Sequence, residues 1–298
     1  MTTEESMQLQ SFELRLGDIA DVDLESLHAL SIAVGWPHRA EDWQMLRAAG
    51  NGVVALDQIG RVLGSAMWFP FGSDFSTVGM VITSPRLQAN GTGRWLMDHV
   101  LKQSGSRHLG LSATRAAYRL YLSMGFTPEK IVCQCQGNAV LPTPSDLPTG
   151  AVLRAVSSGD LVEIAALDQS AYGADRSAVL TQLMAVSEGT VLTRGGCIAA
   201  FALCRRFGRG FVVGPVVASN DADAIAVAEP HVAAHAGQFL RLDTRNTNGP
   251  FAEKLTQWGL PVFDTVTSMS LGGPWLVGKD EQPAAGPMIY ALINQALS

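Results

Sequence analysis

The sequence predicts an α/β protein built from two tandem domains of one fold. Two observations carry this prediction. In the first half a strand, a glycine-rich turn and a helix follow one another, and the strand of that unit recurs in the second half. The strand signal is an apolar run at 78–83, and the helix signal is apolar residues at helical spacing over 96–101. A chain of 298 residues exceeds a typical single domain and can bury a core in each of two.

The turn between this strand and helix reads Gln88-Ala89-Asn90-Gly91-Thr92-Gly93. Glycines here leave backbone N–H groups pointing outward, and the helix N-terminus adds roughly half a positive charge, so the turn is a candidate pyrophosphate site. A Rossmann fingerprint is excluded because Leu96 stands where its third glycine belongs. A P-loop is excluded because no Gly-Lys-Ser/Thr follows.

A second strand and helix come next. The segment 109–114 is predicted to be a strand, and a helical face follows at Ala117, Leu120, Tyr121 and Met124. The Gly125-Phe126 pair ends that helix, because glycine is the usual residue after a helix C-terminus.

These two segments together resemble the GCN5-related N-acetyltransferase (GNAT) superfamily. In that family Gln/Arg-x-x-Gly-x-Gly/Ala opens a helix after a strand, and Ala-x-x-Leu-Tyr-x-x-x-Gly-Phe follows the next strand. The matching segments here are 88–93 and 117–126, in the family's spacing and order. Thr114 departs from the family, many members of which carry Asn there. The resemblance implies, for each domain, a mixed α+β fold: a mostly antiparallel twisted sheet flanked by helices, with one splayed strand pair.

The resemblance also implies acetyl-CoA as the acetyl donor, with coenzyme A as product. The pantetheine arm would lie in the splay and pair with the backbone there, one N–H pointing toward the thioester carbonyl, and the turn amides would bind the pyrophosphate. The residues predicted to bind the coenzyme are Val81, Ile82, Thr83, Gln88, Ala89, Asn90, Gly91, Thr92, Gly93, Arg94, Thr114 and Tyr118.

Tyr121 is the predicted catalytic residue, a general acid for the departing thiolate. Transfer of a proton from a phenol to a thiolate is uphill by about 1.5 pKa units, about 2 kcal/mol, which positioning can overcome. Tyr118, three residues earlier, is the alternative acid. The general base is not identified by the sequence, which leaves Asp74, His108 and Asp243 open.

The chain repeats itself at an offset of about 135 residues: the strand at 78–84 recurs at 213–219. Three prolines and two glycines at 137–150 predict a linker. The predicted domains are therefore 1–137, catalytic and coenzyme-binding, and 151–298, joined by a linker at 138–150.

The second copy lacks the features of the first that suit coenzyme A. At the same offset Gln88 becomes Asp223, Gly91 becomes Ala226 and Gly93 becomes Ala228; at an offset of 134, Tyr121 becomes Leu255. The second copy is therefore predicted to be degenerate and to complete the acceptor pocket. In this respect the whole chain resembles tandem GNAT proteins with a divergent C-terminal domain.

The predicted acceptor is a small-molecule primary amine, reached by direct transfer in a ternary complex. Candidate acceptor contacts are Trp36, His38, Trp68, Tyr172 and Arg176. An aromatic pocket of this kind favours a small aromatic or apolar amine. Two alternatives stay open: a non-catalytic acyl-CoA-binding sensor, and a protein or peptide N-acetyltransferase. A monomer containing an internal pseudo-dimer is expected, or a homodimer.

Composition excludes several other function classes. The net charge of −6 argues against nucleic-acid and anionic-membrane partners, and no apolar run approaches the ~20 residues of a membrane span. Four cysteines are too few for a disulfide framework, and Cys133 with Cys135 suggests packing on one strand face, so no metal is expected. With no signal-peptide pattern at the start, a cytoplasmic location is predicted.

Overall fold

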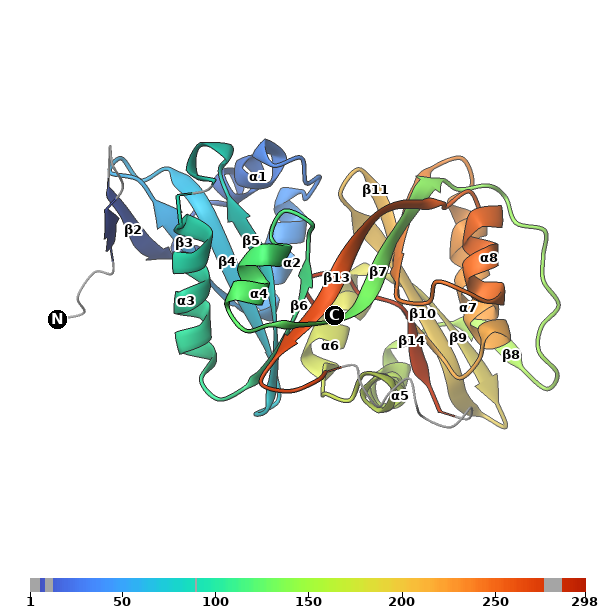
Figure 1. The fold of residues 1–298 in the computed structure, drawn as a ribbon. Coiled ribbons are helices and arrows are strands. Elements are labelled where there is room, and N and C mark those ends of the chain that lie inside the picture. Colours follow the sequence, from blue (N-terminus) through green and yellow to red (C-terminus); the bar gives the residue numbers. More distant parts are fainter. Residues whose placement is uncertain (1–5, 9–12, 89, 276–285) are drawn as a thin grey trace. The chain divides into compact units, whose positions relative to one another are not determined.

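The computed structural model describes residues 6–8, 13–88, 90–275 and 286–298, and the chain divides into two compact units, 1–110 and 111–298 (Figure 1). The elements of the first unit are β1 (Ser6–Gln8), β2 (Glu13–Asp18), α1 (Leu24–Ala33), α2 (Ala40–Ala49), β3 (Asn51–Leu56), β4 (Val62–Phe71), β5 (Phe75–Thr83) and α3 (Thr92–Ser104). Strand β6 (His108–Ala113) crosses the boundary between the units.

The second unit contains more elements. They are α4 (Tyr118–Ser123), β7 (Thr127–Asn138), β8 (Val152–Ala155), α5 (Leu161–Tyr172), α6 (Ser177–Val186), β9 (Glu188–Arg194), β10 (Cys197–Phe207), β11 (Gly210–Ala218), α7 (Asp221–Ala234), β12 (Phe239–Thr244), α8 (Pro250–Gln257), β13 (Val262–Leu271) and β14 (Met288–Ala291).

The first unit is an antiparallel sheet in the order β1-β2-β3-β4-β5. Helix α3 packs on β3, β4 and β5 through an apolar face, because Leu96, Met97 and Val100 recur at helical spacing and are fully buried. Helices α1 and α2 pack on each other, and α1 also contacts β4 and β5. The predicted strand and helix on either side of the 88–93 turn are thus β5 and α3.

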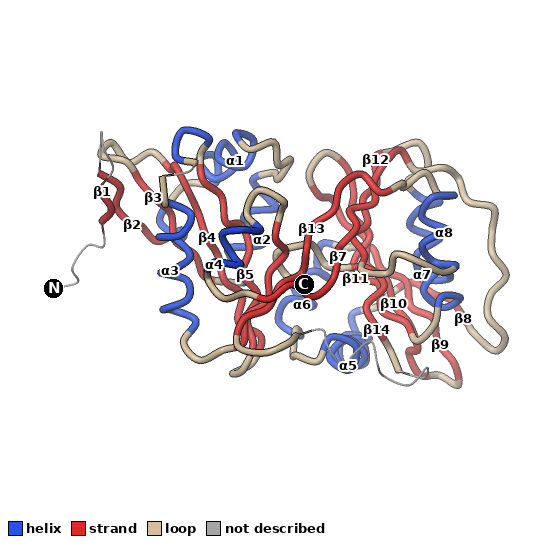
Figure 2. The backbone as a smooth tube through the Cα atoms, in the orientation of Figure 1, coloured by secondary structure: helices blue, strands red, loops and turns tan. Residues whose placement is uncertain are grey.

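The second unit is a mixed sheet in the order β13-β7-β12-β11-β10-β9-β8 (Figure 2). Its neighbours are antiparallel except β11 and β12, which run parallel. Helix α7 packs on β9, β10 and β11, and α5 packs on β10, β11 and β14. The predicted mixed and mostly antiparallel architecture is confirmed.

The order of elements occurs twice. Strands and helices from β2 to β7 follow the sequence β-α-α-β-β-β-α-β-α-β, and those from β8 to β13 repeat it. Strand β5 corresponds to β11, and α3 corresponds to α7, at the offset read from the sequence. Two copies of one fold are therefore present, as predicted.

Strand β7 belongs to the first copy by sequence but pairs on both edges with the second. It lies between β12 and β13 and is antiparallel to both, with Cys135 opposite Leu242 and Val132 opposite Val266. This pairing explains why the second compact unit begins at Leu111, well before the predicted domain boundary at 137. The predicted boundary at 137 marks the end of the first sequence repeat, not of a compact unit, and it stays a prediction.

The segment 139–151, which includes most of the predicted linker, contains no helix or strand. It is nonetheless anchored, because the carboxylate of Glu229 on α7 accepts hydrogen bonds from the backbone N–H and the hydroxyl of Ser145, at 2.8 and 2.7 Å. In the described ranges, none of the helices combines the length and the apolar character that a bilayer-spanning segment needs.

The pairing of β7 makes a specific prediction about truncation. A chain ending at residue 150 would remove β12 and β13 and leave both edges of β7 without partners. Because exposed apolar strand edges associate with other chains, we expect the fragment 1–150 to aggregate. Size-exclusion chromatography against the full-length protein tests this; a fragment that elutes as a folded monomer would contradict it.

Candidate active site

The predicted pyrophosphate turn lies in the first unit at the start of α3. Gly91 is the residue before the helix and has a left-handed backbone, with φ +80° and ψ −5°. A side chain would strain this conformation, which explains the glycine. The first turn of a helix leaves its N–H groups without intrahelical acceptors. Within the described residues, the N–H groups of Thr92 and Gly93 also have no hydrogen-bond acceptor outside the helix.

The surroundings of the turn favour an anion. Gln88, Asn90 and Gly91 are exposed, and Arg86 and Arg94 on either side of the turn are exposed cations. The buried hydroxyl of Thr92 has no hydrogen-bond partner within the described residues. Ala89 lies outside the described residues. Backbone donors, a helix N-terminus and flanking cations together fit the diphosphate of coenzyme A.

Strand β5, which carries the predicted pantetheine-binding residues, contains a β-bulge. Ser65 pairs with Ile82 and Met67 with Gly79, so two residues, Met80 and Val81, oppose Ala66 alone. Met80 has φ +51°. Val81 and Thr83 are half-buried and Ile82 is fully buried. Sequence periodicity gave no signal for this bulge, since Met80 is neither Gly nor Asn.

Tyr121, the predicted general acid, lies on α4 in the second unit. Its side chain is 4% exposed, and its ring packs edge-on against Phe126 with centroids 5.8 Å apart. Burial raises the pKa of Tyr121 above its usual value. The phenol is therefore kept protonated, which suits hydrogen-bond donation better than complete proton transfer.

The start of α4 is shaped by Thr114. Its carbonyl accepts hydrogen bonds from the N–H groups of Ala117 and Tyr118, at 3.1 and 3.0 Å. Thr114 and Tyr118 are both half-buried. Thr114 thus orders the turn that leads into the tyrosine-bearing helix; the prediction that both residues contact the coenzyme stays a prediction.

The second copy has a helix where the first has the turn. Helix α7 begins at Asp221, so the residues that correspond to Gln88, Gly91 and Gly93 lie inside it. The cause is local composition: Ala226 and Ala228 are strong helix formers, and Asn220 caps the helix by accepting from the N–H of Asp223 at 3.0 Å.

The carboxylates of this helix are already engaged. Asp223 is 1% exposed and forms a bidentate ion pair with Arg194, at 2.6 and 2.7 Å. Asp221 accepts from the N–H of Phe251 at 3.0 Å. Both carboxylates thus have partners within the second copy, and a helix replaces the open turn of the first copy. Leu255, which corresponds to Tyr121, is buried in the core.

The splayed strand pair is directly visible in the second unit. The parallel strands β11 and β12 pair only at Phe211–Leu240 and Val212–Arg241. Beyond that point β14 lies against β11, with Val216 opposite Ala291 and Ala218 opposite Met288.

The opposite side of β14 is bound to β12. The hydroxyl of Thr244 donates to the carbonyl of Tyr290 at 2.6 Å, and the N–H of Leu292 donates to the carbonyl of Asp243 at 2.8 Å. The splay of the second copy is therefore filled by the chain itself. A Cβ placed on Gly214 would clash with the carbonyl of Leu292, so this close approach depends on glycine.

Three predicted acceptor contacts lie in the first unit. The rings of Trp36 and His38, in the segment between α1 and α2, are 5.8 Å apart, and His38 lies 6.4 Å from the buried ring of Trp43. The two predicted residues are half-buried and form an aromatic cluster with Trp43. Trp68 is also half-buried, on β4 opposite Val78.

The other two acceptor predictions lie in the core of the second unit. Arg176 is 1% exposed; it pairs with Asp168 at 2.7 and 2.9 Å and donates to the carbonyl of Leu297 at 3.2 Å. Tyr172 is 3% exposed and stacks under the Arg176 guanidinium at 3.7 Å. In this structure Arg176 holds the carbonyl of Leu297 and Tyr172 packs against Arg176, so an acceptor contact would require these core contacts to break. Their role at the acceptor stays a prediction.

Of the open general-base candidates, Asp243 is least suited. It is 1% exposed and forms a bidentate ion pair with Arg241 at 2.6 and 2.9 Å. Asp74 and His108 lie together in the first unit, where the N–H of His108 donates to the carbonyl of Asp74 at 2.8 Å. His108 is exposed.

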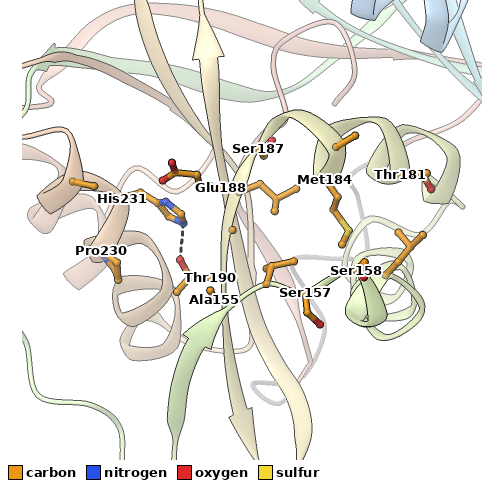
Figure 3. A pocket seen from close by; sticks show the side chains of 16 residues that line it. Ala155, Ser157, Ser158, Thr181, Met184, Ser187, Glu188, Thr190, Pro230 and His231 are labelled. Carbon is orange, nitrogen blue, oxygen red and sulfur yellow. Dashed lines mark hydrogen bonds between the residues drawn. The ribbon is translucent and has the colours of Figure 1, made fainter.

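A pocket of about 740 Å³ lies in the second unit and contains none of the predicted site residues (Figure 3). Its lining includes Met184, Thr190 and His231. The His231 Nε2 is 2.6 Å from the Thr190 hydroxyl, and burial lowers the pKa of His231 to about 4. The imidazole is therefore neutral near pH 7 and serves as a buried structural hydrogen-bond partner.

Comparison with known proteins gives consistent matches. Two models described as "Acetyltransferase (GNAT) domain" match residues 48–128 and 164–282, one in each copy. The uncharacterized N-acetyltransferase YitH of Bacillus subtilis (strain 168) is 25% identical over 267 residues, covering 88% of this chain and 91% of YitH.

Solved structures share the fold along most of the chain. A proposed acetyltransferase from Pyrococcus horikoshii matches with a TM-score of 0.76 at 18% identity, covering 99% of each chain. A tandem GNAT protein from the clavulanic acid biosynthesis pathway matches with a TM-score of 0.62 at 15% identity, covering 88% of this chain and 99% of its own. With the repeated element order and the two matched domains, these findings place the chain in a family: it is a tandem protein of the GNAT family of acyltransferases.

Proposed function

We propose that this protein is an N-acetyltransferase that binds acetyl-CoA in its first copy and transfers the acetyl group directly to a small primary amine. The observation that carries the proposal is the contrast between the two copies. The first has a left-handed glycine and outward N–H groups at the start of α3. The second has a helix whose Asp223 carboxylate is ion-paired, and a filled splay.

The second copy also supports the proposed pairing of pantetheine. Residues 216–218 of β11 correspond to Val81, Ile82 and Thr83 of β5, and they form a ladder with the extended strand β14. Backbone at this place in the fold thus pairs with an extended chain. Pantetheine is an extended arm with two amide groups, so the same kind of edge on β5 can pair with it.

In the proposed reaction the amine nitrogen forms a bond to the acetyl carbon, and the bond from that carbon to sulfur breaks. Tyr121, a phenol that is protonated at neutral pH and whose pKa burial raises further, donates a hydrogen bond to the departing thiolate. The amine must lose a proton to water or to a basic side chain, with Asp74 and His108, both exposed, as the candidates in the first unit. The half-buried Trp36 and His38 rings favour an apolar or aromatic amine.

Isothermal titration with acetyl-CoA, followed by thiol release against a panel of aliphatic and aromatic primary amines, tests the proposal. We expect one equivalent of acetyl-CoA per chain, since only the first copy has an open turn, and thiol release with at least one amine. Two equivalents would contradict the assigned roles of the copies. Binding without thiol release on any amine would favour an acyl-CoA-binding sensor.

A further inference from the structure

The bulge of β5 is held by a buried hydroxyl on the neighbouring strand. Ser65 is 0% exposed, and its Oγ donates a hydrogen bond of 2.7 Å to the carbonyl of Met80, which is 4% exposed. Among the described residues, Met80 is the one non-glycine residue with a positive φ. A left-handed conformation is unfavourable for a residue other than glycine, so the surroundings must stabilise it.

The bulge decides which backbone groups of β5 face away from β4. In an antiparallel ladder, successive residues alternate between the two edges of the strand. An extra residue shifts that alternation by one for every residue that follows. The orientation of the N–H groups of Val81, Ile82 and Thr83 therefore depends on the bulge at Met80.

The second copy has the bulge but not the hydroxyl. There, Ala202 pairs with Val216 and Cys204 with Val213, so the strand bulges at 214–215. In the first copy Ser65 pairs with Ile82. At the repeat offset Ile82 corresponds to Val217, and Val217 pairs with Phe201 on β10. The next partner, Ala202, has no hydroxyl either. The hydrogen bond to the bulge thus occurs in the copy proposed to be catalytic and is absent from the described residues of the copy whose splay is filled.

We infer that Ser65 is a positioning residue for acetyl transfer. By holding the Met80 carbonyl, it fixes the β5 backbone N–H that donates a hydrogen bond to the thioester carbonyl oxygen. This inference rests on the proposed function. Ser65 contacts no substrate in this role. It acts through the backbone, and its effect is largest when negative charge develops on the acetyl oxygen.

The test compares Ser65→Ala with Ser104→Ala. Ser104 is also 0% exposed and donates to a backbone carbonyl, that of Val100, at 2.8 Å, but it lies at the last residue of α3. Both variants lose one buried hydroxyl of the same kind, so a general loss of stability affects them alike. Affinity for coenzyme A, which has no acetyl oxygen, is measured beside kcat with the panel amine that the wild type acetylates fastest.

For Ser65→Ala we expect kcat to fall about tenfold, with the affinity for coenzyme A changed less than twofold. For Ser104→Ala we expect both to stay near the wild-type values. Ser65→Cys, close to serine in volume but a weak donor, should also lower kcat, and it replaces the alanine variant if that one does not fold.

Three outcomes overturn the inference: a wild-type kcat in the folded Ser65 variants, an equal fall in kcat for Ser104→Ala, or a loss of coenzyme A affinity as large as the loss of kcat. The proposed function fails differently, since the wild-type protein itself would then bind no acetyl-CoA or acetylate no amine.

Discussion

Replacement of Gly91 by aspartate is expected to weaken acetyl-CoA binding at least about a hundredfold. The new carboxylate would stand at the start of α3, where the outward N–H groups are proposed to bind the diphosphate. Two unit charges 4 Å apart near a protein surface interact by about 4 kcal/mol, which is more than two orders of magnitude in affinity. Isothermal titration with acetyl-CoA measures the change directly.

Gly60→Asp is the matched control. Gly60 lies in the hairpin between β3 and β4 and has φ +82°, nearly the value of +80° at Gly91, with no atom near the added Cβ. Both variants therefore incur a similar backbone strain and gain one negative charge. We expect Gly60→Asp to lose stability but to bind acetyl-CoA as the wild type does. Normal affinity in Gly91→Asp would remove the turn from the coenzyme site.

The prediction from sequence succeeded where local chemistry determines local structure. The apolar run at 78–83 and the glycine at 91 specify a strand, a left-handed turn and a helix, and β5, Gly91 and α3 occur there. The loss of glycines in the second copy was equally informative, since Ala226 and Ala228 now lie inside α7.

Features that depend on contacts distant in the sequence could not be predicted in this way. The pairing of β7 with β12 and β13 joins residues more than a hundred positions apart, and its alternating apolar pattern suits any partner edge. The bulge at Met80 is stabilised by Ser65 from another strand. The burial of Arg176 could not be predicted either, because its partners, the carboxylate of Asp168 and the carbonyl of Leu297, reach it only in the folded chain.

The filled splay lets the second copy satisfy its backbone hydrogen bonds without a bound ligand. The segment 288–298 supplies a strand to β11 and accepts hydrogen bonds from two arginines, Arg176 to the carbonyl of Leu297 and Arg205 to that of Ile293. A splayed strand pair without an occupant would leave backbone groups of β11 and β12 unsatisfied. This internal occupant removes that cost in the second copy, whereas in the first copy we propose that coenzyme A pairs with the edge of β5.

Tyr121→Phe is expected to lower kcat about tenfold to a hundredfold and to leave the affinity for acetyl-CoA within about twofold of the wild type. The substitution removes only the hydroxyl, and the ring can keep its packing against Phe126. Because the phenol is protonated and burial raises its pKa further, the interaction proposed to be lost is a hydrogen bond to a thiolate that forms only as the bond to sulfur breaks. Steady-state kinetics and titration with acetyl-CoA separate the two effects.

Tyr290→Phe controls for the loss of a buried phenol, since Tyr290 is also 4% exposed and packs against Phe251 in the second copy. Its kcat should match the wild type. Tyr118→Phe identifies the acid: if it lowers kcat while Tyr121→Phe does not, the role passes to Tyr118. If Tyr118→Phe and Tyr121→Phe both keep full activity, neither tyrosine assists the leaving thiolate. The thiolate would then depart without a donor from α4, which is feasible for a leaving group with a pKa near 8.5.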